Sequence, residues 1–175
     1  KIITANFDEQ KKIAQSFWGK SNIKIESTIL PYNRHMEKTA FESIFNKKIK
    51  SFEDKIIITV SALSNIPRKG FDIFLDFLPK FEIECERNRK NVIINIVTKE
   101  NINIDINSEF LTIIQHGLLN TMDFEELLAS SHGFLSFSRS DSGPFTLNMC
   151  YHLKVLIFSF NVGVAPEILK KSKSI

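Results

Sequence analysis

One short segment of the sequence restricts the fold more than any other. Residues 56–60 read Ile-Ile-Ile-Thr-Val, a run of β-branched side chains without polar alternation. A strand of an antiparallel sheet with one wet face alternates apolar and polar residues, whereas a parallel strand is covered on both faces and is apolar throughout. The segment therefore predicts a buried strand in a parallel sheet.

A helix is expected directly after this strand. Apolar side chains recur there at the i, i+3, i+4 and i+7 spacing that places residues on one face of a helix. They are Phe71, Phe74, Leu75 and Leu78. A second apolar run follows at residues 92–97, where the next parallel strand would lie. This order of strand, helix and strand is that of a βαβ unit.

The same alternation continues towards the end of the chain. Further strands are expected at residues 110–115, 134–138 and 155–158. Further helices are expected from Asp123 until Gly133 ends the helix, over residues 144–153, and over residues 166–171. The fold class predicted from this pattern is α/β, with a Rossmann-like, doubly wound parallel sheet.

The first fifty residues follow the alternation less closely. The pattern there predicts a helix at residues 7–18, a strand at 23–30, a turn at 31–33, and a surface helix with a loop at 37–55. We expect residues 1–50 to form an N-terminal helix and strand extension, an interdomain segment that packs on one Rossmann-like domain at residues 51–175.

Composition excludes several classes of protein. A net charge of +3 over 175 residues is too small to indicate a nucleic-acid-binding protein, in which basic residues cluster in a stripe. The two cysteines and four histidines have the spacing of neither a disulfide framework nor a metal site. No run of 18 or more uncharged apolar residues is present to span a membrane.

Two loops carry the residues that could bind a ligand or take part in catalysis. Both loops are expected beyond the carboxyl ends of strands, where doubly wound sheets bind ligands. In the first loop, Arg68, Lys69 and Gly70 precede a helix. Two cations, free backbone N–H groups and the positive end of the helix dipole together favour a phosphate. The alternative is that both cations are solvated and Gly70 serves only the turn, because the Walker and GxGxxG signatures are absent.

The second loop spans residues 138–144 and carries one carboxylate, Asp141. Ser142 and Gly143 would let the backbone approach an anionic ligand closely. The alternative is that Asp141 or Ser142 caps the helix that follows. No nucleophile lies beside a base in this loop, and the GxSxG elbow is missing.

Five blocks along the chain, in order, are similar to motifs of one enzyme family. They are residues 60–72 (VSALSNIPRKGFD, similar to a strand, loop and "KG" helix start), 116–117 with the helix at 123–131 (HG, "hG"), 137–141 (FSRSD, "PSRSE"), 154–157 (KVLI, "KPVI") and 162–169 (VGVAPEIL, "VGGVPEIV"). The chain resembles the C-terminal, nucleotide-sugar-binding domain of the family 4 (group 1) GT-B glycosyltransferases. Residues 29–33 resemble the "vIPNG" turn before that domain, so the resemblance covers nearly the whole chain.

The resemblance implies a role for each matching residue. Lys69 would hold the diphosphate of the sugar donor, with Arg68, Gly70, Ser142 and Gly143 as further substrate-binding residues. Asp141 would occupy the first acidic position of the E-x7-E motif and face the sugar. The second acidic position, which grips the ribose hydroxyls, falls on Asn148. These roles suit retaining transfer without a metal or other cofactor, because a fixed cation and helix N–H groups can stabilise the charge on the leaving diphosphate.

The sequence also departs from the family pattern. Asp141 and Asn148 are one residue closer together than the motif requires, and Pro144 stands in its glycine-rich stretch. Ala62 replaces the arginine that normally supplies a second diphosphate cation, a place that Arg68 would have to fill. These departures leave open a catalytically degenerate module that binds a nucleotide or a partner. A nucleotide-sugar epimerase would need acid and base residues of its own, which the sequence does not offer.

The resemblance sets the remaining expectations. We expect a fragment of a larger hexosyltransferase, truncated at its C-terminal end and inactive without an N-terminal acceptor domain. Its substrates would be a nucleotide sugar and a glycan or lipid-linked acceptor, in cell-surface polysaccharide synthesis. We expect a cytoplasmic location that allows peripheral contact with the inner face of the membrane, and no nucleic-acid partner.

Overall fold

The computed structural model describes most of the chain. The described residues are 2–5, 24–27, 32, 34–61, 67–106, 108–141, 145–163 and 165–172. The predicted helix at residues 7–18 and most of the predicted turn at 31–33 lie outside them.

The centre of the fold is a five-stranded sheet in which every pairing is parallel. Its strands are β3 (Lys55–Ser61), β4 (Asn91–Val97), β5 (Leu111–His116), β6 (Gly133–Ser136) and β7 (Leu156–Ser159), and their order across the sheet is β5-β4-β3-β6-β7. The chain winds outward from β3 through β4 to β5, then crosses back and winds the other way through β6 to β7. The predicted doubly wound α/β fold is confirmed.

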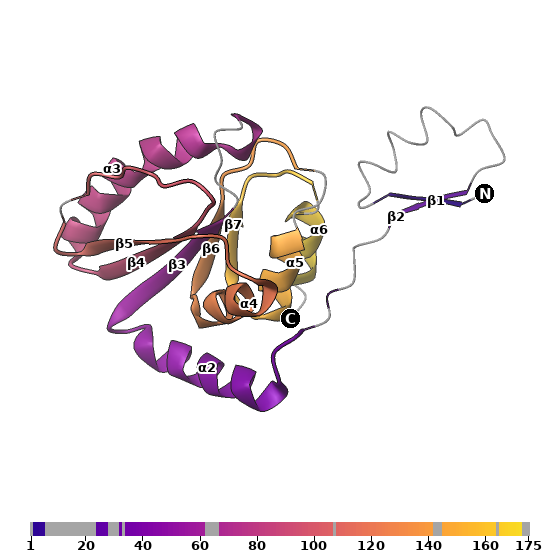
Figure 1. Ribbon diagram of the computed structural model, residues 1–175, viewed down its shortest axis with the longest axis horizontal. Coiled ribbons are helices and arrows are strands. Elements are labelled where there is room, and N and C mark those ends of the chain that lie inside the picture. The colour runs from indigo at the N-terminus through magenta and orange to yellow at the C-terminus, as the bar shows by residue number, and fades with distance from the viewer. Residues whose placement is uncertain are drawn as a thin grey trace.

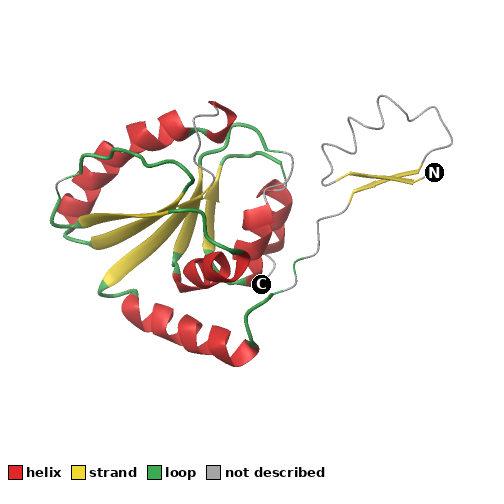
Figure 2. Cartoon of the chain, viewed as in Figure 1, coloured by secondary structure: helices red, strands yellow, loops and turns green. Residues whose placement is uncertain are grey.

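Helices cover both faces of this sheet. Helix α3 (Phe71–Asn88) lies on one face, and α4 (Thr121–Ser130), α5 (Phe145–His152) and α6 (Ala165–Ser172) lie on the other (Figures 1 and 2). Helix α2 (Lys38–Ser51) packs against α4. The predicted surface helix at residues 37–55 is therefore confirmed as α2.

Each face has its own apolar core. On the α3 face, Phe74 and Leu78 pack on Val60, Ile94 and Ile96, all at most 2% exposed. The opposite face is filled by side chains from four helices and the β6–β7 half of the sheet, which include Phe41, Leu128, Phe134, Leu147, Leu153 and Ile168. Burial on both faces explains why residues 56–60 are β-branched without alternation.

The one polar residue of the run at 56–60 is buried with a partner. Thr59 is fully buried on the α4 side of β3, and its hydroxyl lies 2.7 Å from the Ser131 hydroxyl. The Ser131 hydroxyl in turn donates to the backbone carbonyl of Leu127 at 2.8 Å. A buried hydroxyl loses free energy unless it is hydrogen-bonded, so this chain of bonds accounts for a threonine inside an isoleucine run.

The predicted apolar face of α3 needs one correction. Leu75 is 38% exposed, whereas Phe74, Leu78 and Cys85 are buried. The buried stripe is therefore narrower than the sequence pattern suggests, because a helix lying on a flat sheet contacts it along one line of side chains.

The ends of α4 also differ from the prediction. The helix begins at Thr121 rather than Asp123, because the Asn120 side chain caps it by accepting the Asp123 N–H at 2.9 Å. It ends at Ser130, and Gly133 is the first residue of β6 rather than the end of the helix. The bounds of the five strands and of α5 and α6 lie within two residues of the predicted ones, and α3 extends beyond the predicted stripe to Asn88.

Two short strands lie ahead of this domain. Strands β1 (Ile2–Ala5) and β2 (Lys24–Ser27) pair in parallel as a separate two-stranded sheet, and β2 falls within the predicted strand at residues 23–30. The domain boundary at residue 50 stays a prediction.

A buried carboxylate fastens the segment that leads into α2. Glu125 of α4 is 1% exposed, and its two oxygens accept the backbone N–H groups of His35 at 3.0 Å and Met36 at 3.1 Å. These bonds satisfy a carboxylate that would otherwise be costly to bury. They fix residues 35–36 to the helical layer beside the sheet.

Candidate functional site

The two predicted loops meet at the carboxyl edge of the sheet, between β3 and β6. These strands are neighbours, yet the connections that leave them belong to the two halves of the sheet that wind in opposite directions. Such a topological switch point opens a crevice beyond the strands and is where doubly wound sheets bind ligands.

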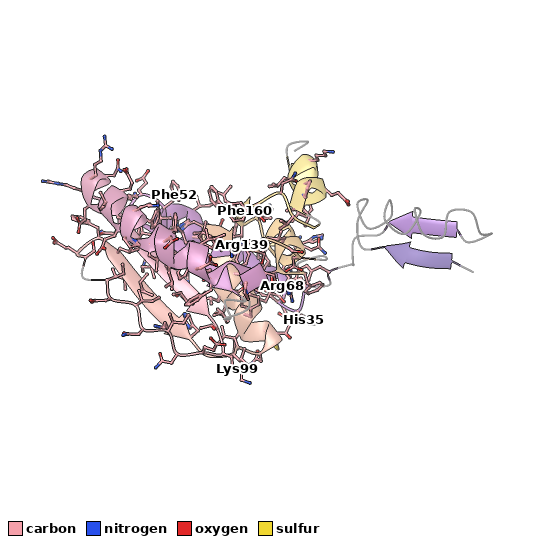
Figure 3. All side chains as sticks on the ribbon, turned by 90° about the horizontal axis from the view of Figure 1, so that it is seen from above. His35, Phe52, Arg68, Lys99, Arg139 and Phe160 are labelled. Carbon is pink, nitrogen blue, oxygen red and sulfur yellow. The ribbon has the colours of Figure 1, made fainter. Side chains whose placement is uncertain are left out.

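Backbone contacts hold the two loops together. The short 3₁₀ turn η1 (Pro67–Lys69) leads into α3, and the Arg68 carbonyl accepts the N–H groups of Arg139 at 2.8 Å and Ser140 at 3.4 Å. Figure 3, seen from above, labels Arg68 and Arg139 close to each other. The loop after β6 therefore lies directly against the turn before α3.

Gly70 makes this close approach possible. It is the N-cap of α3 with φ +69°, a left-handed conformation that favours glycine. A Cβ at this position would lie 1.9 Å from the Phe137 carbonyl oxygen. Gly70 therefore serves the turn, and its phosphate-binding role stays a prediction.

The contact between Lys69 and Asp141 is the central feature of the site. Lys69 Nζ donates to Asp141 Oδ2 at 2.6 Å, and the two side chains are only 17% and 11% exposed. Both were singled out from the sequence, from loops 72 residues apart. The fold places an ammonium and a carboxylate, both largely withdrawn from water, at the switch point.

A second ion pair braces the same loops. Arg139 donates from Nη1 to Asp72 Oδ1 at 2.6 Å and from Nη2 to Oδ2 at 2.5 Å, and Nη1 also reaches the Pro67 carbonyl at 2.8 Å. The bonds from Arg139 to the carboxylate, with the N–H groups of Asp72 and Ile73, lower the pKa of Asp72 to about 2. Bidentate pairing fixes the orientation of both groups, so it aligns the turn with the loop.

This second pair was not predicted. Asp72 and Arg139 both lie within the motif blocks, but neither was assigned a role from the sequence. They are 67 residues apart, and only the pairing of β3 with β6 brings them together. The signal in the sequence was a cation two residues before Asp141 and an acid two residues after Gly70.

The remaining predicted site residues have different positions. Arg68 is exposed, in contrast to Lys69. Asn148 lies in α5 and is 6% exposed. Ser142 and Gly143 lie outside the described residues, as does Ala62. The substitution of Arg68 for the missing cation and the ribose contact of Asn148 stay predictions.

An apolar cavity adjoins the site and was not predicted either. It has a volume of about 300 Å³ at the carboxyl ends of β6 and β7. It is lined by Phe77, Leu135, Ser136, Phe137, Phe158, Ser159 and Phe160. Phe137 directly precedes the loop that carries Arg139 and Asp141, so the cavity and the ion pairs share one edge of the sheet.

The part of the chain that the structure describes contains neither a cluster of metal ligands nor a membrane-spanning helix. There, histidine, cysteine and acidic side chains do not gather in any group of three or more that could hold a metal ion. None of the described helices is long and apolar enough to cross a bilayer.

Comparisons with known proteins support the fold. Neither a family model nor a curated relative matches the chain. Among solved structures, WaaG, a glycosyltransferase involved in lipopolysaccharide biosynthesis, is similar with a TM-score of 0.59 and 14% identity over 95% of this chain and 46% of WaaG. A structure of the GtfA/B complex is similar with a TM-score of 0.55 and 13% identity, over 94% of this chain and 31% of that one.

These comparisons confirm the predicted Rossmann-like fold of the kind found in GT-B glycosyltransferases. This chain spans less than half the length of either matched structure. Identities this low establish the shared fold, and function has to be argued from the site.

Proposed function

We propose that this chain is the C-terminal, donor-binding domain of a retaining glycosyltransferase of family 4. The enzyme would move a hexosyl group from a nucleotide sugar to a glycan or lipid-linked acceptor in cell-surface polysaccharide synthesis. The observation that carries the proposal is the meeting of Lys69 and Asp141 at the switch point of the sheet. The similarity of its fold to that of WaaG supports it.

Lys69 would stabilise the leaving group. As the glycosidic bond breaks, negative charge develops on the departing nucleoside diphosphate, and a cation already in place stabilises that charge without a metal. The Lys69 side chain is 17% exposed, and a charge interaction is stronger where water is largely excluded. The bidentate Arg139–Asp72 pair keeps the turn that carries Lys69 in position.

Asp141 and Asn148 would contact the sugar and the ribose. Asp141 lies two residues after Arg139, so its carboxylate extends from the same braced loop towards Lys69. Asn148 would donate an amide hydrogen bond to a ribose hydroxyl, which is weaker than the bond that a carboxylate accepts. The acceptor would come from a partner α/β domain across the crevice.

The proposal is tested by isothermal titration of nucleoside diphosphates and nucleotide sugars into the chain. A hydrogen bond to a charged group contributes about 1.5–3 kcal/mol, so Lys69→Ala should weaken binding at least about tenfold. Lys80→Ala is the matched control, because Lys80 is an exposed lysine of α3. If no compound binds at millimolar concentration, or Lys69→Ala binds as well as Lys80→Ala, the proposal is wrong.

A catalytically degenerate module of the same fold is the second candidate. It is favoured by Asn148, an amide at the second acidic position that is also 6% exposed. Such a module would bind a nucleotide through Lys69 without transferring a sugar. Sugar transfer or hydrolysis of a nucleotide sugar by a longer chain that contains this domain would exclude it.

A further inference from the structure

We infer that Asp141 competes with a bound diphosphate for Lys69. In the ligand-free chain the Asp141 carboxylate is paired with the Lys69 ammonium, which is the group that a diphosphate would bind. Binding of a diphosphate would therefore replace the Asp141–Lys69 ion pair with an ion pair between the diphosphate and Lys69. This inference rests on the proposed function and adds a regulation of the same site. It concerns what the Asp141 carboxylate does before a sugar donor arrives and after the diphosphate is formed.

The geometry of the pair carries the inference. Lys69 Nζ and Asp141 Oδ2 are 2.6 Å apart, a short charge-assisted hydrogen bond, and both side chains are largely covered. A diphosphate within hydrogen-bond distance of Lys69 Nζ would bring its negative charge close to the Asp141 carboxylate. Like charges at such a distance repel, and partial burial strengthens the repulsion. The carboxylate therefore has to turn away for a diphosphate to bind.

The surrounding hydrogen bonds indicate which of the two residues moves when a diphosphate binds. The turn that carries Lys69 is held by the Gly70 N–H to Pro67 carbonyl bond and by the Arg139 contacts to Pro67 and Asp72. The last backbone bond from the loop to the turn comes from the Ser140 N–H, and Asp141 reaches Lys69 through its side chain. The exchange thus moves the Asp141 side chain while the turn before α3 keeps its place.

The competition has two consequences for the ligand. A diphosphate carries more charge than a singly charged anion, so it competes more strongly with the carboxylate for Lys69. After the sugar has left, the carboxylate returns to Lys69 and favours release of the nucleoside diphosphate. Asp141 would then act both on the sugar during transfer and on the product after it.

The test is the affinity of the 175-residue chain for pyrophosphate, UDP, GDP and ADP, measured by isothermal titration with variants at positions 141, 69 and 54. Asp141→Asn keeps the shape of the side chain and removes its charge, and it should bind at least one of these anions about tenfold more tightly. Asp54→Asn removes the same charge just before β3, at the opposite edge of the sheet, and should change affinity less than twofold. Combining Asp141→Asn with Lys69→Ala should abolish the gain.

Each outcome decides between the two proposals. If Lys69→Ala weakens binding but Asp141→Asn weakens it or leaves it unchanged, the competition is wrong and the proposed function stands. If none of the anions binds to any variant, both are wrong. Asp141→Ser, which removes the charge with a shorter side chain, should reproduce the gain, and the urea unfolding midpoints of all variants show that they are folded.

Discussion

Replacement of Gly70 by alanine tests whether the close approach of the two loops maintains the site. Gly70 has φ +69°, and an added Cβ would lie 1.9 Å from the Phe137 carbonyl oxygen. Real Cβ atoms essentially never approach another heavy atom within 3.0 Å, so the turn or the loop has to shift by about 1.1 Å. We therefore expect Gly70→Ala to destabilise the fold and to separate Lys69 from Asp141.

The size of the effect follows from two contributions. An alanine in the left-handed region costs about 1–2 kcal/mol relative to glycine. Forcing a packed backbone to shift costs about 1–3 kcal/mol more. The free energy of unfolding should thus fall by about 2–5 kcal/mol, a large part of the 5–15 kcal/mol that is typical of a domain.

The assay is urea denaturation followed by circular dichroism, with Gly117→Ala as the matched control. Gly117 follows β5 at the same edge of the sheet, and an added Cβ there meets no atom within 4 Å. Gly117→Ala should change the free energy of unfolding by less than about 1 kcal/mol. Equal stability of the two variants would refute the reasoning, because it would mean that the Gly70 contact with Phe137 can relax at no cost.

Two further predictions concern stability. The Nδ1 atom of His132 accepts the Ile57 N–H at 2.8 Å, and burial lowers the pKa of His132 in the folded chain. The unfolded chain therefore binds a proton at this residue more readily than the folded chain does. The free energy of unfolding should fall as the pH drops below about 6.5. Urea denaturation at pH 7.5 and pH 5 checks this, and His132→Asn, which cannot titrate, should lose less stability between these values; an equal loss would contradict it. Asn120→Ala removes the cap that Asp123 donates to and should cost about 1 kcal/mol, whereas Asn120→Ser should retain most of it; unchanged thermal stability of Asn120→Ala would show that the cap is dispensable.

Much of the fold could be predicted because its signals are local. A strand covered on both faces must be apolar at every position, so residues 56–60 and 92–97 identified β3 and β4. Helix ends were less predictable, because they depend on single contacts. The Asn120 cap places the start of α4 at Thr121, two residues before the predicted start. The position of Gly133 in β6 could not be predicted from the spacing of apolar residues.

In the candidate site, too, the residues could be predicted from the sequence, but their contacts could not. Lys69 and Asp141 could be identified from the sequence by itself, since each is a charged residue in a loop after a strand of a doubly wound sheet. Their contact at 2.6 Å was decided by the order of the strands, which places β6 beside β3 rather than beside β5. The sequence of one loop shows which charged side chains it carries. It does not show which other loop will lie beside it in the fold.

Three features of the site were determined only by the tertiary structure. The carbonyl of Phe137 excludes a side chain at Gly70, Arg139 pairs with Asp72, and side chains from α3, β6 and β7 enclose a cavity. The first two join segments 67 residues apart. A residue's burial preference and its local conformation are encoded near it in the chain, whereas the partner it meets depends on how the whole sheet is wound.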